Sequence, residues 1–332
     1  MNPAQYIRTF KELSQTSPPA KIFLYGDAKL LKDGLMRAFR KQVEGMEDFA
    51  LDVFWMNELK SKDDYKVIFD SLLSLPMLSD RRIVILRNFD VSRATEKKII
   101  EGLANFSFPD TAMLIVESES LDMRRKEGRA ISKMFRTIEL PTPGEREMVE
   151  WISYFARRAG KKMTISAAKE LINIAGISLA AVREEVEKIV NFVEDDFIRV
   201  EDVRQVCAHS RSAHIFQFAN AVQSLDFDLA MKLSIKLMNF GEQHSVILSW
   251  MNRSLGDLLW AKIDPNGLAK RLGKRAFLAQ KIKNAAQPLD REKIISALAL
   301  LHQADMMVKK SSADPKTAVI WAIARTKEIL AE

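Results

Sequence analysis

Residues 21–25 read KIFLY, residues 51–55 LDVFW, residues 82–86 RIVIL and residues 112–117 AMLIVE. Each run is short, apolar and rich in β-branched or aromatic residues, as expected of a strand buried on both faces. Helical periods separate the runs, and the first of them covers residues 30–43. Alternation of this kind predicts a parallel sheet with helices on both faces.

The intervening helices are marked by apolar residues three and four positions apart. In residues 30–43, Leu31, Leu35 and Phe39 share one face, and in residues 63–73 we expect Val67, Ile68 and Leu72 to point inward. The remaining elements of this region are helices over residues 95–103 and 124–134 and a last short strand over residues 137–140.

A Pro-Thr-Pro-Gly run at 141–144 ends the β signal. Such a run continues neither a strand nor a helix, so it is typical of a linker. Helical patterns fill the rest of the chain, with Thr164 and Ser178 as expected N-caps. We therefore predict three domains: an α/β domain over 1–140, a helical domain over 141–210 and a second helical domain over 211–332.

Composition narrows the function classes. The chain of 332 residues has a single cysteine, Cys207, which excludes an internal disulfide framework and a cysteine metal cluster. The first residues lack the apolar core of a signal peptide, and no apolar run approaches the ~20 residues of a membrane span. We therefore expect a cytoplasmic protein with no membrane partner.

The turn after the first strand bears on nucleotide chemistry. A phosphate-binding P-loop needs a glycine-rich loop followed by Lys and then Ser or Thr. The turn at 26–34 reads GDAKLLKDG: neither Lys29 nor Lys32 precedes a hydroxyl, and Asp27 would repel a triphosphate. After the strand at 82–86, Asp90 is expected to be a turn residue rather than a metal ligand. We therefore expect no ATP hydrolysis, no cofactor, no metal site and no catalytic residue.

A second feature is the segment Leu75, Pro76, Met77 and Leu78, which follows a predicted helix. Pro76 forces the residue before it out of helical geometry. Met77 and Leu78 then stand side by side next to Ser-Asp-Arg-Arg. Two adjacent large apolar residues at a protruding point suit the pocket of a partner. The alternative is that both fold back under the sheet as ordinary core.

The positive charge of the chain is unevenly distributed. Residues 1–208 hold 33 basic and 33 acidic residues, whereas residues 209–332 hold 18 basic and 11 acidic ones, so the net charge of +7 lies in the last part. A short stretch there is dense in basic side chains, which could face DNA or form a solvated surface. Besides Lys262, the candidates are Lys270, Arg271, Lys274, Arg275, Lys281 and Lys283.

Taken together, these motifs resemble the δ subunit family of the bacterial DNA polymerase III clamp loader, over nearly the whole chain. The likeness rests on FLYG at 23–26 without a P-loop and on SLPMLSDRRIV at 74–84, where the family more often has Leu-Phe or Phe-Phe in place of Met77-Leu78. It also rests on shorter matches in the helical part: Gly176 with Leu179, residues 185–189, residues 214–216, Ala230 with Leu233 and Leu237, residues 241–242, and Ala304-Asp305 with Lys309.

This resemblance implies an AAA+-like sheet domain that lacks a P-loop, followed by an all-α lid and an all-α collar. It implies a non-catalytic subunit of a DNA-directed DNA polymerase holoenzyme. The family binds the β sliding clamp through the element that here is Leu75–Leu78 and opens the ring. Its other partners are the γ/τ-type ATPase subunits, the δ′ subunit and primed DNA. From the residues alone, an ATP-binding motor with a diverged P-loop and a basic helical DNA-binding protein remain alternatives.

Overall fold

The computed structural model describes residues 1–14, 20–59, 62–107, 109–207 and 211–331. The chain divides into two compact units, Met1–Pro143 and Gly144–Glu332. The border falls inside the Pro-Thr-Pro-Gly run at 141–144. Among the described residues, no helix is both long and apolar enough to cross a membrane.

The first unit is built around a five-stranded sheet in the order β2-β3-β4-β1-β5, and every neighbouring pair is parallel. The order places β1 in the interior of the sheet and β2 and β5 at its edges. The elements are α1 (Pro3–Leu13), β1 (Lys21–Tyr25), α2 (Lys29–Arg40), a 3₁₀ turn (Lys41–Val43), α3 (Glu47–Ala50), β2 (Leu51–Trp55), α4 (Lys62–Leu73), β3 (Arg82–Phe89), α5 (Ala94–Ala104), β4 (Ala112–Ser118), α6 (Lys126–Met134) and β5 (Arg136–Glu139).

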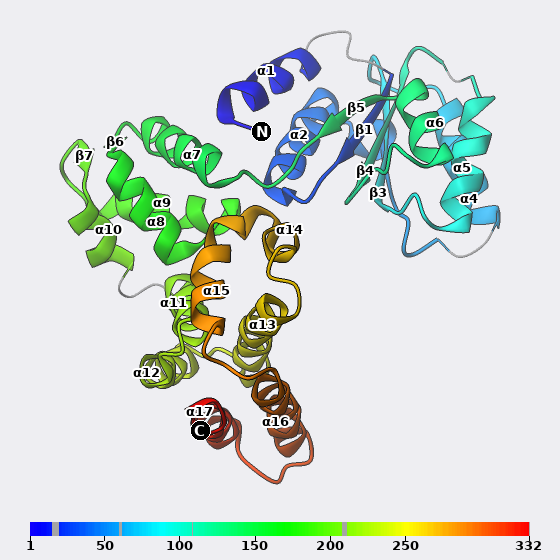
Figure 1. Cartoon of the computed structure of the whole chain (residues 1–332). Helices are drawn as coiled ribbons and strands as arrows, with labels where there is room; N and C mark the ends of the chain where they lie inside the picture. The colour runs from blue at the N-terminus through cyan, green and yellow to red at the C-terminus, as the bar shows by residue number, and fades with distance from the viewer. Residues whose placement is uncertain (15–19, 60–61, 108, 208–210, 332) are drawn as a thin grey trace. The chain divides into compact units, whose positions relative to one another are not determined.

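Helices cover both faces of this sheet, with α1 and α2 on one side and α4, α5 and α6 on the other (Figure 1). Alternate strand residues serve the two faces. On β1, Phe23 joins the core beneath α4, α5 and α6, which also includes Ile68, Ile99 and Ile131. Burial on both faces explains why the strands read as continuous apolar runs.

The predicted α/β class is confirmed, with one local error. Ile68 and Leu72 are fully buried on α4, but Val67 is 51% exposed. Adjacent helical positions lie about 100° apart, so Val67 and Ile68 cannot both face the sheet squarely.

The second unit is helical almost throughout. Its elements are α7 (Glu145–Arg158), β6 (Lys162–Met163), α8 (Ile165–Ala175), α9 (Leu179–Phe192), β7 (Phe197–Ile198), α10 (Val200–Cys207), α11 (Arg211–Gln223), α12 (Phe227–Asn239), α13 (His244–Ile263), α14 (Leu268–Leu272), a 3₁₀ segment (Gly273–Leu278), α15 (Ala279–Ala286), α16 (Arg291–Lys309) and α17 (Pro315–Ala331). The two-residue strands β6 and β7 pair in parallel, a ladder that the sequence pattern did not predict.

The two N-caps expected in this unit are present. The hydroxyl of Thr164 accepts from the backbone N–H of Ala167, and that of Ser178 accepts from the N–H of Ala181. Each bond satisfies one of the free N–H groups that begin a helix.

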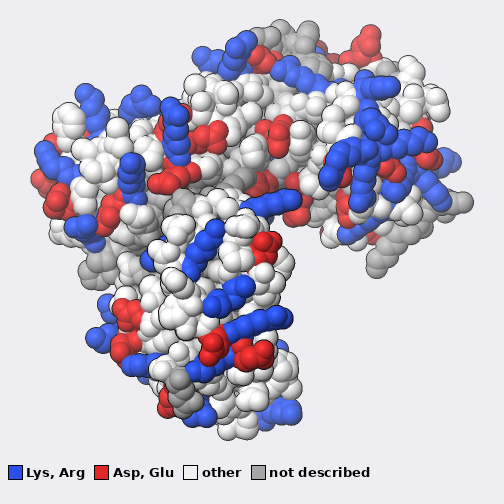
Figure 2. Space-filling model, in the orientation of Figure 1, with Lys and Arg blue, Asp and Glu red and all other residues white. Residues whose placement is uncertain are grey.

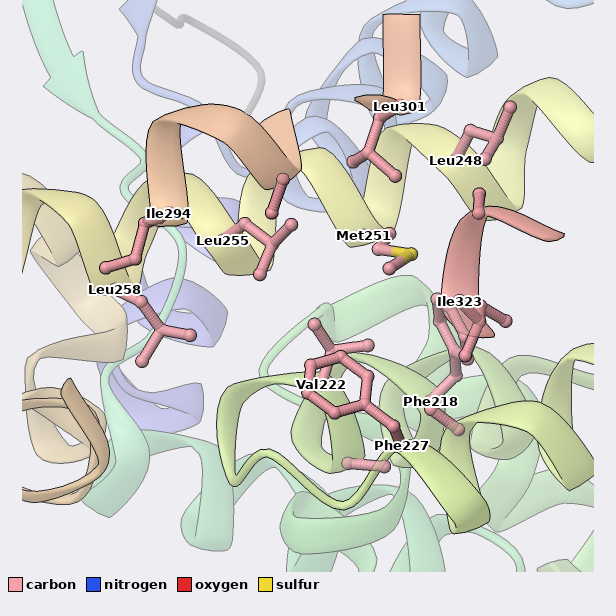
Figure 3. Close-up of a cluster of buried hydrophobic side chains, with 14 of the residues drawn as sticks. Phe218, Val222, Phe227, Leu248, Met251, Leu255, Leu258, Ile294, Leu301 and Ile323 are labelled. Carbon is pink, nitrogen blue, oxygen red and sulfur yellow. The ribbon is translucent and has the colours of Figure 1, made fainter. Parts of the chain in front are cut away.

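Side chains from the seven helices α11 to α17 meet in a core of the second unit. Figure 3 shows Phe218 and Val222 of α11 and Phe227 of α12 facing Met251 and Leu255 of α13, with residues of α16 and α17 beside them. The residues of this core run from Phe218 to Ile323. The boundary between a lid and a collar at about residue 210 stays a prediction.

Candidate functional site

The loop between α4 and β3, residues 74–81, contains the four predicted partner-binding residues. It precedes β3 and therefore lies at the amino edge of the parallel sheet. The turn after β1 lies at the opposite, carboxyl edge, where open α/β sheets bind their ligands. The two candidate sites are thus separated by the length of the strands.

Three apolar side chains of this loop are turned to solvent. Leu75 is 69% exposed, Met77 66% and Leu78 77%, while Pro76 is half-buried. Leu73, at the end of α4, is also exposed. These values exclude the alternative in which the pair folds back into the core. We call Leu75–Leu78 the apolar tip.

The backbone of the tip is strained at one point. Leu78 has a φ of +64°, which is the left-handed region that residues with a Cβ seldom adopt. Holding a leucine there costs about 1–2 kcal/mol. A strained backbone conformation persists only where the surrounding structure holds it in place. Such conformations are concentrated at functional sites.

A polar cluster holds the base of the loop. Arg82 begins β3 and pairs with Asp52 of β2 at 2.5 Å, and its guanidinium also donates to the carbonyl oxygen of Phe49 at 3.0 Å. The hydroxyl of Ser71, on α4, donates to the same carboxylate of Asp52. Asp52 thus ties together the helix that enters the loop and the strand that leaves it. A fixed base lowers the entropy lost when the tip binds a partner.

At the carboxyl edge, the turn after β1 is too short to surround a phosphate. Helix α2 already begins at Lys29, three residues after Gly26. Leu31, at the position of the second P-loop glycine, is buried at 2% exposure. Asp27 accepts a hydrogen bond from the backbone N–H of Thr142 at 2.7 Å, so its carboxylate holds the end of the first unit to this turn.

A group of ion pairs lies at the carboxyl edge of the sheet beside this turn. Lys32 donates to Glu117 at the end of β4 at 2.6 Å and to the carbonyl oxygen of Ser118 at 3.1 Å. Arg87 of β3 lies 3.3 Å from Glu117 and 2.9 Å from Asp33. Side chains of Lys32 and Glu117 are only 4% and 8% exposed. We call Lys32, Asp33, Arg87 and Glu117 the charge cluster.

The charge cluster keeps Glu117 ionised. Burial by itself would raise the pKa of this carboxyl, but the hydrogen bond and charge of Lys32, together with Arg87, outweigh it and hold the pKa below its ordinary value. Since the two cations balance Glu117 and Asp33, the cluster is neutral as a whole. Neutrality makes its burial tolerable.

A bulge in β3 allows Arg87 to reach this cluster. Asn88 has a φ of +57°, and the register with β4 shifts between Leu86 and Phe89. The extra residue leaves Arg87 beside Glu117 and returns Phe89 to the core. The backbone N–H of Asn88 points to Glu117 at 3.5 Å. Asp90 accepts two hydrogen bonds from Ser92, as expected of a turn residue.

Sequence reasoning missed the charge cluster, although one signal was present. Lys32 follows Gly26 by six positions, which is the spacing between the first glycine and the lysine of a P-loop. Glu117 stands 85 positions further along, and no local pattern links the two residues. Among the described residues, no group of three or more His, Cys, Asp or Glu is placed to hold a metal ion.

The basic residues predicted near the end of the chain have unequal surroundings. Lys270, Arg271 and Lys281 are exposed, and Lys283 is half-buried. Arg271 lies over the ring of Trp260 at 4.6 Å, and Lys262 donates to the carbonyl oxygen of Gln287.

Arg275 differs from these residues because it is largely buried. Its guanidinium lies 3.4 Å from the buried carboxylate of Asp257. Burial lowers the pKa of Arg275, in part offset by Asp257. The side chain of Lys274 lies outside the described part of the structure. The predicted strip is therefore not a uniform row of solvent-facing cations.

The first unit carries a second basic surface, although residues 1–208 have no net charge. Figure 2 shows Lys and Arg side chains crowding the side of the first unit that carries α5 and α6. Arg124 and Arg125 begin this surface, with side chains 91% and 59% exposed, and both lie near Asp122. Lys126, Arg129 and Lys133 are also exposed. Net charge over a long segment cannot reveal such local concentration.

No family model and no curated protein sequence matches the chain. Among solved structures, the Bacillus subtilis DNA clamp loader delta protein (YqeN) is similar with a TM-score of 0.69 and 19% identity, covering 97% of this chain and 99% of that one. The Thermotoga maritima RuvB Holliday junction branch migration motor gives a TM-score of 0.42 at 15% identity, with 85% and 84% covered. A variant of that motor gives 0.43 at 13%. The chain therefore has, over nearly its whole length, the fold of a bacterial clamp loader delta protein, as its sequence motifs predicted.

Proposed function

We propose that this chain is the δ-type subunit of a bacterial clamp loader, a cytoplasmic replication protein that binds the β sliding clamp and opens its ring for loading onto primed DNA. The observation that carries the proposal is the exposed apolar tip on a scaffold with the delta fold. A monomer gains nothing from exposing Leu75, Met77 and Leu78 together, and a partner pocket would gain their burial.

The tip has the physical properties of a hydrophobic anchor. Each large side chain removed from water contributes about 1.5–3 kcal/mol. Met77 is flexible and adapts to an irregular pocket, and Leu78 fills volume. The base held by Asp52 and Arg82 keeps the tip in place before binding.

The subunit does not hydrolyse ATP in this proposal. Three features support this part: the early start of α2, the buried Leu31 and the charge cluster at the edge where a nucleotide would bind. ATP hydrolysis then belongs to partner subunits of the γ/τ type, which assemble with this chain and a δ′ subunit through its helical domains. Equilibrium dialysis of the purified chain against Mg-ATP tests this part, and saturable binding in the micromolar range would refute it.

Clamp binding is tested with the double variant Met77→Ala/Leu78→Ala and the sliding clamp encoded by the same genome. We expect a loss of roughly 3–5 kcal/mol, or a few hundred-fold or more in Kd, with incomplete burial and non-additivity allowed for. The matched control is Val67→Ala/Met123→Ala, which removes two exposed apolar side chains from the same unit. Equal affinity of the tip variant and the control, measured by calorimetry on folded protein, would exclude the tip as the anchor.

The basic residues near the end of the chain are assigned to DNA only within the assembled loader. Exposed Lys270, Arg271 and Lys281 are the members that can face a phosphate backbone, and each such contact steepens the dependence of affinity on salt. Their triple Glu variant should load clamps less well at physiological salt, with the largest difference from wild type at low salt. Unchanged loading would make this a solvated surface.

A further inference from the structure

The carboxylate of Glu117 is surrounded by three donors from two segments of the chain, α2 and β3. Lys32 Nζ of α2 lies 2.6 Å from one of its oxygens, and Arg87 Nε of β3 lies 3.3 Å from the other. The backbone N–H of Asn88, raised by the β3 bulge, points to that second oxygen at 3.5 Å. An ammonium, a guanidinium and a backbone N–H converging on one carboxylate are the components of an oxyanion site.

This group lies where the fold would hold a ligand. It sits at the carboxyl edge of the sheet, between the start of α2 and the ends of β3 and β4. Lys32 has the spacing from Gly26 of a P-loop lysine. Glu117 therefore stands in the place of the anion.

Burial makes an anion necessary here. Lys32 is 4% exposed, and besides Glu117 it donates to the carbonyl oxygen of Ser118, which carries no charge. Arg87 has a second carboxylate partner, Asp33, but that side chain is 30% exposed. Without Glu117, Lys32 would be left as a buried ammonium without a counter-charge in contact, which is strongly unfavourable.

We propose that Glu117 is an internal counter-anion that occupies a small oxyanion site, and that this site binds free phosphate or carboxylate once the Glu117 side chain is removed. Only small anions fit this site, because α2 begins too early for a loop to surround a nucleotide. In the native chain the Glu117 side chain occupies the site. This inference does not depend on clamp binding, so its test and that of the apolar tip succeed or fail separately.

The test is chemical rescue of Glu117→Ala. Replacement by alanine deletes the CH₂–COO⁻ part of the side chain, which acetate can replace, and inorganic phosphate is the second probe. Thermal unfolding is followed at pH 7 with sodium acetate, sodium phosphate or sodium chloride at equal ionic strength. We expect Glu117→Ala to melt well below wild type in chloride, and both oxyanions to raise its Tm saturably by several degrees more than chloride does.

Two variants serve as controls. Glu119→Ala removes the same charge two residues away, from an exposed side chain, and should show no oxyanion effect beyond that of wild type. Lys32→Met/Glu117→Ala removes the buried cation as well, so it should no longer respond to acetate or phosphate. A response that persists in this double variant would place the anion elsewhere and overturn the proposal.

The remaining outcomes are also decisive. Equal Tm values in acetate, phosphate and chloride for a folded Glu117→Ala variant would show that no oxyanion site is vacated. If the variant is unfolded in chloride, circular dichroism should report its refolding on addition of either oxyanion. Failure to refold, with the double variant folded, would equally overturn the proposal.

Discussion

Replacing Leu78 tests the geometry of the apolar tip most directly. Leu78 is 77% exposed and has a φ of +64°. Truncation to alanine removes few buried contacts, so it should cost about 0.4–0.7 kcal/mol, roughly a quarter of the free energy of burying the whole side chain. Alanine keeps the Cβ and therefore the left-handed strain. Glycine removes both.

The order of stability of the glycine and alanine variants should consequently be the reverse of the order at ordinary positions. At ordinary positions glycine is less stable than alanine by about 0.5–1 kcal/mol, because its unfolded state has more freedom. At Leu78, relief of about 1–2 kcal/mol of left-handed strain exceeds that cost. We expect Leu78→Gly to be more stable than Leu78→Ala by about 0.5–1 kcal/mol.

Urea unfolding followed by circular dichroism measures this difference in the transition that melts the sheet. The same pair of substitutions at Val67, an exposed position inside α4, is the control, and there glycine should be less stable by about 1 kcal/mol. Both Leu78 variants should bind the clamp about ten- to a hundred-fold more weakly. A glycine variant less stable than alanine at Leu78 would refute the strained geometry. Losses above about 2 kcal/mol in both variants would indicate a core residue.

Three further predictions concern Gly176, Cys207 and Glu117. Gly176 has a φ of +75°, and a Cβ there would lie 2.5 Å from the ring of Phe216, so Gly176→Ala should lower the free energy of unfolding by at least about 1–3 kcal/mol in a urea titration. Burial first, and then the nearby Glu185, raise the pKa of the Cys207 thiol to about 12, so Ellman's reagent at pH 8 should label the folded chain far more slowly than the unfolded one. The pKa of Glu117 is lowered by folding, so its ionised form stabilises the protein above the unfolded pKa of about 4.3 and that contribution is lost as the pH falls through the lower folded value. The difference in unfolding free energy between wild type and Glu117→Gln should therefore shrink below about pH 4 and be constant between pH 6 and 8.

The α/β class and the linker could be predicted because their causes are local. A strand buried on both faces must be apolar at every position, as in residues 82–86, and such runs stand out in the sequence. The Pro-Thr-Pro-Gly run is compatible with neither a helix nor a strand. The prediction that Val67 points inward was wrong, because the sheet against which α4 packs decides which face of this helix is buried.

The apolar tip could be predicted only in part. The sequence indicated that Pro76 ends the helix and that Met77 and Leu78 stand together, but not whether they are buried. Exposure was decided by the tertiary structure, in which Asp52 on β2 fastens both ends of the loop. A carboxylate 19 positions before Ser71 and 30 before Arg82 leaves no local pattern.

By itself, the sequence determined the alternation of the five sheet strands with helices in the first unit, the break at residues 141–144 and the lack of a complete P-loop, since each follows from neighbouring residues. Only the tertiary structure decided what replaces a ligand at the carboxyl edge. Lys32, Arg87 and Glu117 come from α2, β3 and β4, and the parallel order of the sheet brings their ends together. Together with Asp33 of α2 they form one largely buried group that is neutral as a whole, because an isolated charge in that place would be too costly to bury.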